Sequence, residues 1–289
     1  MLELATPTAV VCHDAGAANL ILGWLKAGGG DTEVRAFMQG PAEALWRTAF
    51  PRQPLCGSLE EALDGVQTLL SGTGWASALE HQARQVAHAR SMRSVAVLDH
   101  WVNYAARFER EGQVQWPSEV WVADAYALAL VRQVLPGLPV RQLDNLYLNA
   151  QVARIGAAPG DGTVLVVLEP VRNTWGRDRE GEFQALDYLF ACLDRLWPGV
   201  AQVLLRQHPS EPSGKYQSWL SRYPVARMDT SRDVAAAINL ADVVVGVESF
   251  ALTIALAAGR PVYSSLPPWA PPLRLPHTGI QQIRHQSQL

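Results

Sequence analysis

Cysteine is scarce in this chain of 289 residues, which contains only Cys12, Cys56 and Cys192. The three lie far apart, their number is odd, and no Cys-x-x-Cys pair occurs. A disulfide framework is therefore not expected, and neither is a cysteine-based zinc site. This usage is typical of a protein kept in a reducing, cytoplasmic environment.

Long apolar runs and an excess of basic charge are also missing. No run reaches the roughly 18 apolar residues that a membrane-spanning helix needs. The opening MLELATPTAVVCHDAG lacks the basic region and the long apolar region of a signal peptide. Lysine and arginine number 24 against 27 aspartate and glutamate residues, a net charge of -3. We therefore expect no integral membrane segment and no nucleic-acid partner.

Several motifs of well-known catalytic sites do not occur. There is no GxGxxG after the first expected strand, no Walker loop, no DxD motif and no Ser-His-Asp order. Dinucleotide binding is thus not supported. No carboxylate-rich cluster suggests a metal site either, so neither a cofactor nor a metal ion is expected.

What the chain does contain is a regular alternation of short apolar runs with helical patterns. Hydrophobic residues make up 48% and charged residues 18%, enough for a sizeable core. Strands alternating with helices predict α/β architecture with a parallel, doubly wound sheet. The expected strands cover residues 8–12, 33–38, 66–70, 94–98, 119–123, 140–143, 163–168, 202–205, 225–228, 243–247 and 262–265.

A small, polar segment from Gly156 to Gly162 interrupts this rhythm and reads as a linker. It predicts two Rossmann-like domains, 1–157 and 158–289, facing across a cleft. The proline-rich tail after Leu266 is expected to be extended and could pack on the first domain.

Polar residues follow the expected strands of the first domain. Because right-handed crossovers bring the carboxyl ends of parallel strands to one edge, these side chains should line one rim, where ligands bind. The residues are His13, Asp14, Ser71, Thr73, Asp99, His100, Asp124 and Asn145.

The densest polar and aromatic group on this rim begins at Asp99. It continues with His100, Trp101, Asn103, Tyr104, Arg107 and Phe108. An acid, a proton carrier, stacking rings and an anion ligand within ten positions suit a sugar or a base. The alternative is structural: the three aromatic residues would be core residues at helical spacing, Asp99 an N-cap and Arg107 its surface partner.

His13 and Asp14 form a candidate general-base pair after the first strand. Histidine suits proton transfer near neutral pH. In the alternative interpretation Asp14 caps the following helix and His13 is a satisfied core group. We rank His13 first and Asp99 second as proton acceptor, with Asp14 the third candidate.

The stretch from Val203 to Pro261 contains the other half of the expected site. VLLRQHPSE ends a strand with Arg206 and His208, and LADVVVGVESFALTIALAAGRPV runs from a buried strand into a helix at Glu248 and Ser249. Phosphate and carboxylate groups bind at such strand-to-helix turns. The structural alternatives are that His-Pro merely ends a strand and that Glu248 and Ser249 only cap a helix.

The HP pair, the LADVVVG strand, the ES turn and the AAGRPV ending, in this order, resemble the nucleotide-sugar half of GT-B glycosyltransferases. The UDP-N-acetylglucosamine 2-epimerases are similar. The resemblance covers roughly residues 160–265. It implies that His208 contacts the donor phosphate, as in bacterial sialyl- and Kdo-transferase-like enzymes, and that a base of the first domain serves the acceptor. The chain departs from the pattern at Ile254, where many such enzymes carry a glutamate that holds the ribose.

The leading hypothesis is thus a metal-independent glycosyltransferase that uses a sugar nucleotide in surface polysaccharide or glycoconjugate synthesis. The donor would be bound by Arg206, His208, Glu248 and Ser249, and the acceptor by the first domain. Two alternatives stay open: a sugar-nucleotide epimerase or hydrolase of the same fold, and a non-catalytic binding protein that has kept the fold.

Overall fold

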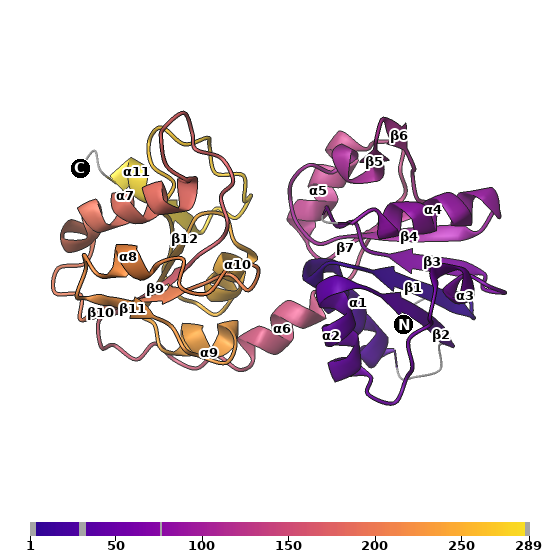
Figure 1. Ribbon diagram of the computed structural model, residues 1–289, viewed down its shortest axis with the longest axis horizontal. Coiled ribbons are helices and arrows are strands. Elements are labelled where there is room, and N and C mark those ends of the chain that lie inside the picture. The colour runs from indigo at the N-terminus through magenta and orange to yellow at the C-terminus, as the bar shows by residue number, and fades with distance from the viewer. Residues whose placement is uncertain (1–3, 29–32, 76, 287–289) are drawn as a thin grey trace. The chain divides into compact units, whose positions relative to one another are not determined.

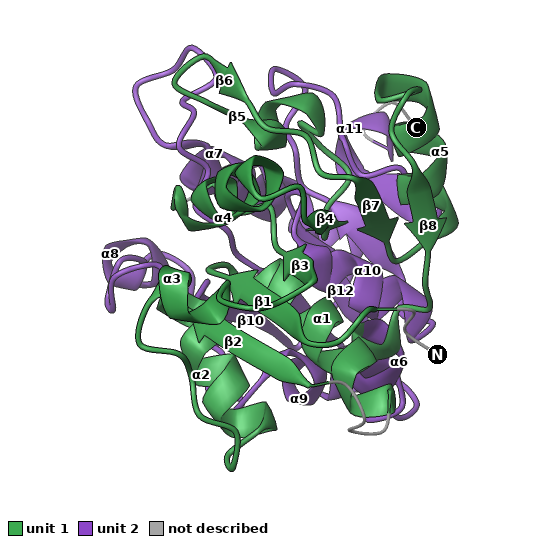
Figure 2. Ribbon diagram, turned by 90° about the vertical axis from the view of Figure 1, so that its right-hand side faces the viewer, with its two compact units in different colours: residues 1–147 green, residues 148–289 purple. Residues whose placement is uncertain are grey.

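The computed structural model describes residues 4–28, 33–75 and 77–286. The chain forms two compact units, residues 1–147 and 148–289, coloured separately in Figure 2. Each unit is an α/β structure with its own parallel sheet and its own core, so each is described by itself. The expected fold class of two doubly wound α/β units is confirmed.

The first unit is built on a six-stranded sheet in the order β2-β1-β3-β4-β7-β8. All neighbouring strands in it run parallel. The strands are β1 (Thr8–Cys12), β2 (Val34–Met38), β3 (Thr68–Ser71), β4 (Arg93–Leu98), β7 (Glu119–Val122) and β8 (Val140–Gln142). The helices are α1 (Ala15–Ala27), α2 (Gly40–Ala49), α3 (Leu59–Ala62), α4 (Leu79–Ala89), the 3-10 helix η1 (Ala105–Phe108) and α5 (Ala125–Val134), and α6 (Leu146–Val152) continues from this unit into the second.

The strand β1 shows why the central strands are apolar throughout. Successive side chains of a strand point to opposite faces of the sheet. Val10 and Cys12 pack in a cluster with residues of α1 and α2, whereas Ala9 and Val11 pack with residues of α4. Figure 1 shows α1 and α2 on one side of this sheet and α4 on the other. A strand covered on both faces needs apolar residues at every position.

The second unit has a six-stranded parallel sheet in the order β11-β10-β9-β12-β13-β14. Its strands are β9 (Thr163–Val167), β10 (Gln202–Arg206), β11 (Ala226–Met228), β12 (Val243–Gly246), β13 (Val262–Ser264) and β14 (Ile280–Gln282). Its helices are α7 (Gly181–Leu196), α8 (Gln217–Leu220), α9 (Val234–Asn239), α10 (Phe250–Ala257) and α11 (Ile283–Gln286). One face of the sheet packs on α7, α8 and α11 in a single cluster.

The expected linker is bound within the second unit. Gly160 and Gly162 donate their N–H groups to the two carboxylate oxygens of Asp242, at 2.6 and 2.7 Å. Gly156 donates to Asn239 at 2.8 Å. The two units divide between Tyr147 and Leu148, inside α6, whereas the expected boundary lay between residues 157 and 158.

The segment after Leu266 also packs within the second unit. Leu266 and Ala270 are buried in a cluster with Ala185 and Val247, and β14 pairs with β13. Two further elements add to the first unit, the short antiparallel strands β5 (Glu109–Arg110) and β6 (Gln113–Val114). Among the helices that the structure describes, none has the length and apolar character needed to cross a membrane.

Candidate functional site

The strand order of the first unit reverses between β1 and β3, since β2 lies on one side of β1 and all later strands on the other. The space outside the carboxyl ends of strands at such a switch point is the usual ligand site of open α/β sheets. His13 and Asp14 follow β1 there, the loop 72–75 follows β3, and Asp99 follows β4. The sequence therefore places these residues on one rim correctly.

His13 and Asp14 form a hydrogen-bonded pair. Nδ1 of His13 lies 2.8 Å from Oδ1 of Asp14. Because a carboxylate only accepts, Nδ1 is the donor and Nε2 is left to accept a proton. The backbone of Gly40 packs closely against the ring, since a Cβ there would lie only 2.6 Å from Nε2, and the His13 side chain as a whole is 20% exposed. The arrangement is that of a general base oriented by a carboxylate.

The interpretation of Asp14 as a helix cap is wrong. Asp14 occupies the N-cap position of α1, but its side chain makes no capping hydrogen bond. Its second oxygen, Oδ2, instead accepts the backbone N–H of Trp75 at 3.1 Å. The carboxylate thus connects the end of β1 with the loop after β3.

The loop after β3 approaches Cys12 and Asp14 so closely that two of its positions require glycine. A Cβ at Gly72 would lie 2.8 Å from Sγ of Cys12, and one at Gly74 would lie 2.0 Å from Oδ2 of Asp14. Such distances cannot be relieved without movement of the neighbouring groups. Gly72 and Gly74 therefore allow the loop to pack against Cys12 and Asp14 in this conformation.

Asp99 is paired with Arg107 at 3.0 Å. Arg107 also donates to the backbone O and to Oγ1 of Thr73, at 3.2 and 3.3 Å. Arg107 is only 5% exposed, so its interpretation as a surface partner of Asp99 is wrong. The buried guanidinium ties the ends of β3 and β4 together and holds Asp99 at the rim.

The aromatic residues of this cluster are core residues, as the structural alternative had it. Trp101, Tyr104 and Phe108 are all buried. Nε1 of Trp101 donates to both carboxylate oxygens of Asp124, at 3.1 and 2.9 Å. Asp124 in turn accepts the N–H of Ala127 and caps α5. The expected stacking of a ligand on Trp101 is not supported, because its ring is covered by protein.

The remaining rim residues are divided between buried and accessible positions. Ser71 is fully buried and accepts from Arg84 at 3.3 Å, and Thr73 is 1% exposed and donates to the carbonyl of Val97. Their expected contact with a substrate is likewise not supported. His100 and Asn145 are half-buried, and Asn103 is exposed with a left-handed backbone.

Sequence reasoning missed Glu80, which lies directly behind the His13–Asp14 pair. Oε1 of Glu80 accepts the backbone N–H of His13 at 2.8 Å. Glu80 is 1% exposed, and among the described residues Oε2 has no hydrogen-bond partner. Burial raises the pKa of this carboxyl group. A glutamate in the middle of a helical pattern gives no sign of this role in sequence.

The strand order of the second unit reverses between β9 and β12. Glu169 follows β9 and Glu248 follows β12, and the N–H of Glu248 donates to Glu169 at 2.7 Å. Arg274 binds the carboxylate of Glu248 through its backbone N–H at 2.7 Å and through Nε at 2.9 Å. Burial, opposed by the hydrogen bond from Glu248, raises the pKa of Glu169 to about 7. The switch point therefore holds a carboxyl group that titrates near neutral pH.

Glu248 is thus an ion-pair partner of Arg274, a pairing that the sequence does not indicate. Ser249 is the N-cap of α10, and its hydroxyl accepts the N–H of Ala251 at 3.2 Å. The capping interpretation of Ser249 is therefore correct in this structure. The interpretation of Glu248 as a helix cap is wrong, because its carboxylate binds Arg274 instead.

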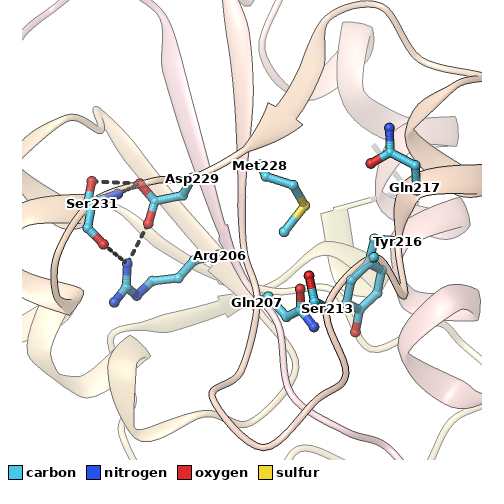
Figure 3. Close-up of a pocket in the computed structure, with 9 residues that line it drawn as sticks. Arg206, Gln207, Ser213, Tyr216, Gln217, Met228, Asp229 and Ser231 are labelled. Carbon is cyan, nitrogen blue, oxygen red and sulfur yellow. Dashed lines mark hydrogen bonds and ion pairs between the residues drawn. The ribbon is translucent and has the colours of Figure 1, made fainter.

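A cavity of about 440 Å³ lies at the carboxyl ends of β10 and β11 (Figure 3). Its volume falls within the range of small-molecule sites. On one side Arg206 donates to the buried Asp229 at 2.5 Å and to the carbonyl of Ser231 at 3.1 Å. The lining residues are Arg206, Gln207, Ser213, Gly214, Tyr216, Gln217, Met228, Asp229 and Ser231.

His208 begins the exposed loop that follows β10. Its Nδ1 lies 2.8 Å from the hydroxyl of Ser210, and its backbone N–H donates to Glu211 at 3.3 Å. Glu211 is itself bound by Lys215 at 2.7 Å and by the hydroxyl of Tyr216 at 2.7 Å. The loop is therefore held in place through Glu211, while the side chain of His208 is exposed.

No protein-family model matches this sequence, and no curated protein matches it. Solved structures do match it. The MnaA–UDP complex of S. aureus has a TM-score of 0.60 at 11% identity over 89% of this chain and 78% of that one. A protein of Listeria monocytogenes described as a UDP-N-acetylglucosamine 2-epimerase has a TM-score of 0.57 at 14% identity, with the same coverage of 89% and 78%. The glycotransferase of kitacinnamycin has a TM-score of 0.50 at 13% identity over 89% of this chain and 79% of that one.

These comparisons show that the chain has the fold shared by GT-B glycosyltransferases and UDP-N-acetylglucosamine 2-epimerases. The resemblance inferred from the HP pair and the ES turn is therefore confirmed as a resemblance of fold. At 11–14% identity it does not carry an activity from one protein to the other.

Proposed function

We propose that this chain is a sugar-nucleotide-dependent glycosyltransferase. The observation that carries the proposal is the His13–Asp14 pair at the switch point of the first unit, with its Nδ1–Oδ1 distance of 2.8 Å. A partly exposed histidine whose Nδ1 is held by a carboxylate suits the removal of a proton from an acceptor hydroxyl at Nε2. The first unit would thus bind the acceptor.

The donor nucleotide would be bound by the second unit. The cavity at the ends of β10 and β11 combines polar groups such as Gln207 and Ser231 with the less polar Met228 and Tyr216. This is a suitable lining for a nucleoside. The fold supports the same assignment, since the S. aureus protein of similar structure is described as a co-structure with UDP. His208, which is exposed and follows the lining residue Gln207 in sequence, is the candidate contact to the phosphates.

In the proposed reaction the acceptor oxygen forms a bond to the anomeric carbon of the sugar as the bond to the nucleotide phosphate breaks. His13 takes the hydroxyl proton at Nε2, and Asp14 stabilises the resulting imidazolium. The leaving phosphate is then stabilised by donors of the second unit. Arg206 is a weaker candidate for that role than the sequence predicts, because it is already paired with Asp229. We retain the expectation of metal-independent catalysis as part of this proposal.

A second candidate, an epimerase or hydrolase of a sugar nucleotide, is favoured by one specific observation. Glu169 has a pKa of about 7 and lies at the switch point of the second unit. A carboxyl group that titrates near neutral pH is suited to acid–base chemistry on a bound nucleotide sugar.

One experiment separates the candidates. The protein is incubated with a panel of sugar nucleotides, with and without a mixture of glycan acceptors, and the nucleoside phosphates and sugars are quantified. A transferase releases nucleoside diphosphate only with acceptor, a hydrolase releases it without, and an epimerase changes the sugar without release. If no sugar nucleotide binds or reacts, the enzymatic proposal fails and a non-catalytic binding role remains.

A further inference from the structure

Trp75 exposes its indole ring at the same edge of the first unit as His13 and Asp14. It is 48% exposed. The peptide group between Gly74 and Trp75 is bound at both its polar atoms, because the N–H of Trp75 donates to Asp14 at 3.1 Å and the carbonyl of Gly74 accepts from Arg110 at 2.5 Å. An aromatic ring that projects from an anchored peptide and is open to solvent beside the His13–Asp14 pair can serve as a stacking surface.

Arg110 places a cationic group next to this ring. Its Cζ lies 5.5 Å from the centroid of Trp75, and that of Arg107 lies 5.8 Å away. Arg107 is neutralised by Asp99. Arg110, in contrast, donates to the carbonyls of Glu109 and Gly74, and no carboxylate of the described residues lies within ion-pair distance of it. Three of its five N–H groups remain available.

The charge of Arg110 contributes to the lowered pKa values of two buried neighbours, His81 and Arg84. Burial lowers the pKa of His81, and the charges of Arg84 and Arg110 lower it further. Burial likewise lowers the pKa of Arg84 to about 10, where Glu80 opposes the shift and Arg110 adds to it. Arg84 itself is 1% exposed and bonds to Ser71 and the carbonyl of Gly72. An anion bound to Arg110 would relieve this repulsion.

We propose that Trp75 and Arg110 form an acceptor subsite that selects a sugar bearing a negative charge, such as a uronic acid or a sugar phosphate. The apolar C–H face of the sugar stacks on the indole ring, and the anionic group accepts hydrogen bonds from the guanidinium. The backbone N–H of Trp75 and Nδ1 of His13 both bind the carboxylate of Asp14, so the subsite adjoins the proposed base. The assignment of this subsite to the acceptor rests on the proposed function, whereas binding of a charged sugar by Trp75 and Arg110 does not.

The test measures binding of three probes to the full chain without nucleotide, by ligand-observed NMR titration. The probes are methyl glucoside, methyl glucuronide and glucose 6-phosphate, so that the neutral sugar, the carboxylate and the phosphate are compared on one ring. We expect the charged probes to bind at least about tenfold more tightly than the neutral one, as loss of a hydrogen bond to a charged group predicts. Whichever charged probe binds better identifies the anion.

The variants assign this binding to the two residues. Trp75→Ala should weaken all three probes, and Arg110→Gln should reduce the charged probes to the level of the neutral one, whereas Arg110→Lys should retain a preference for charge. Trp116→Phe and Arg132→Gln alter an exposed tryptophan and an exposed arginine of the same unit and should change nothing. Thermal melts of each variant check that the unit is folded.

Three results would overturn the subsite: no binding of any probe, equal binding of charged and neutral probes, or unchanged binding by Trp75→Ala. Failure of the proposed function is detected separately, by nucleotide titration of the second unit's site. Sugar binding without nucleotide binding would keep the subsite and remove the transferase, whereas the reverse would remove only the subsite.

Discussion

The backbone N–H of Trp75 donates to Oδ2 of Asp14 at 3.1 Å, although the two residues are 61 positions apart in sequence. This bond joins the two turns that flank the switch point of the first unit. It leaves Oδ1 of Asp14 free to bind His13. The orientation of the proposed base therefore depends on the loop after β3 as well as on its own turn.

Gly74→Ala tests this dependence. The added methyl group would lie 2.0 Å from Oδ2 of Asp14, so the carboxylate or the loop must move. We expect a loss of roughly 1–3 kcal/mol in the free energy of unfolding, typical of overpacking, and a large loss of turnover. Gly137→Ala is the control, because a Cβ at Gly137 meets no atom within 4 Å. Chemical unfolding and activity assays that show the two variants to be alike would contradict the role of Gly74.

His13→Ala tests the proposed base directly. We expect turnover to fall by about two to four powers of ten, the usual contribution of general base catalysis, while the affinity for the donor stays nearly unchanged. Asp14→Asn should also reduce turnover, since it removes the charge that stabilises the imidazolium, and should lower the melting temperature, since an amide has one acceptor oxygen where the carboxylate binds both His13 and the N–H of Trp75. Steady-state kinetics and donor titration measure both quantities. Normal turnover of His13→Ala would transfer the role to Asp99.

The approximate positions of most parallel strands were predictable because buried parallel strands are continuous apolar runs, whereas β14 and the short pair β5 and β6 were not expected. The strand Thr8–Cys12 is found as expected, and β9 ends one residue before its predicted limit at Leu168. The rim of the first unit followed from the same pattern, since a strand end is visible in sequence. Side chains that simply follow a strand, such as His13 and Asp99, were therefore found.

What sequence could not show are contacts between distant positions. Whether Arg107 is exposed depends on Asp99 and on the carbonyl of Thr73, which only the folded sheet brings together. Glu80 is buried because it meets the N–H of His13, 67 positions away. Gly156 to Gly162 reads as a linker by composition, but Asp242 binds its N–H groups. In each case the environment of the residue or segment depends on a partner that is far away in sequence and becomes a neighbour only in the folded chain.

His208→Ala tests the nucleotide site of the second unit. Loss of a hydrogen bond to a charged phosphate should weaken binding of a nucleoside diphosphate by about tenfold to a hundredfold. The fold should be unaffected, because His208 is exposed and its side chain bonds only to Ser210 among the described residues. His285→Ala removes another exposed histidine of the same unit and serves as the control. Calorimetric titration that gives equal affinities for the two variants would remove His208 from the site.

Glu169→Gln tests the electrostatics of the switch point in the second unit through the pH dependence of stability. Burial raises the pKa of Glu169 from 4.5 to about 7 in the folded chain, with Glu248 and Glu211 adding to the shift and the N–H of Glu248 and Arg274 opposing it. A carboxyl group whose pKa is higher in the folded than in the unfolded state disfavours folding once it must ionise. Its cost therefore grows as pH rises from about 4.5 to about 7 and is constant above that range.

Glutamine keeps an acceptor for the N–H of Glu248 but never ionises. We expect the variant to gain stability relative to the wild type across this range, by at most about 3 kcal/mol, since each pKa unit corresponds to about 1.36 kcal/mol. Urea unfolding between pH 4 and 8 measures the difference, with the exposed Glu180→Gln as the control. Parallel curves for wild type and Glu169→Gln would mean that Glu169 is not a neutral-pH carboxyl group, and the epimerase candidate would lose the observation that favours it.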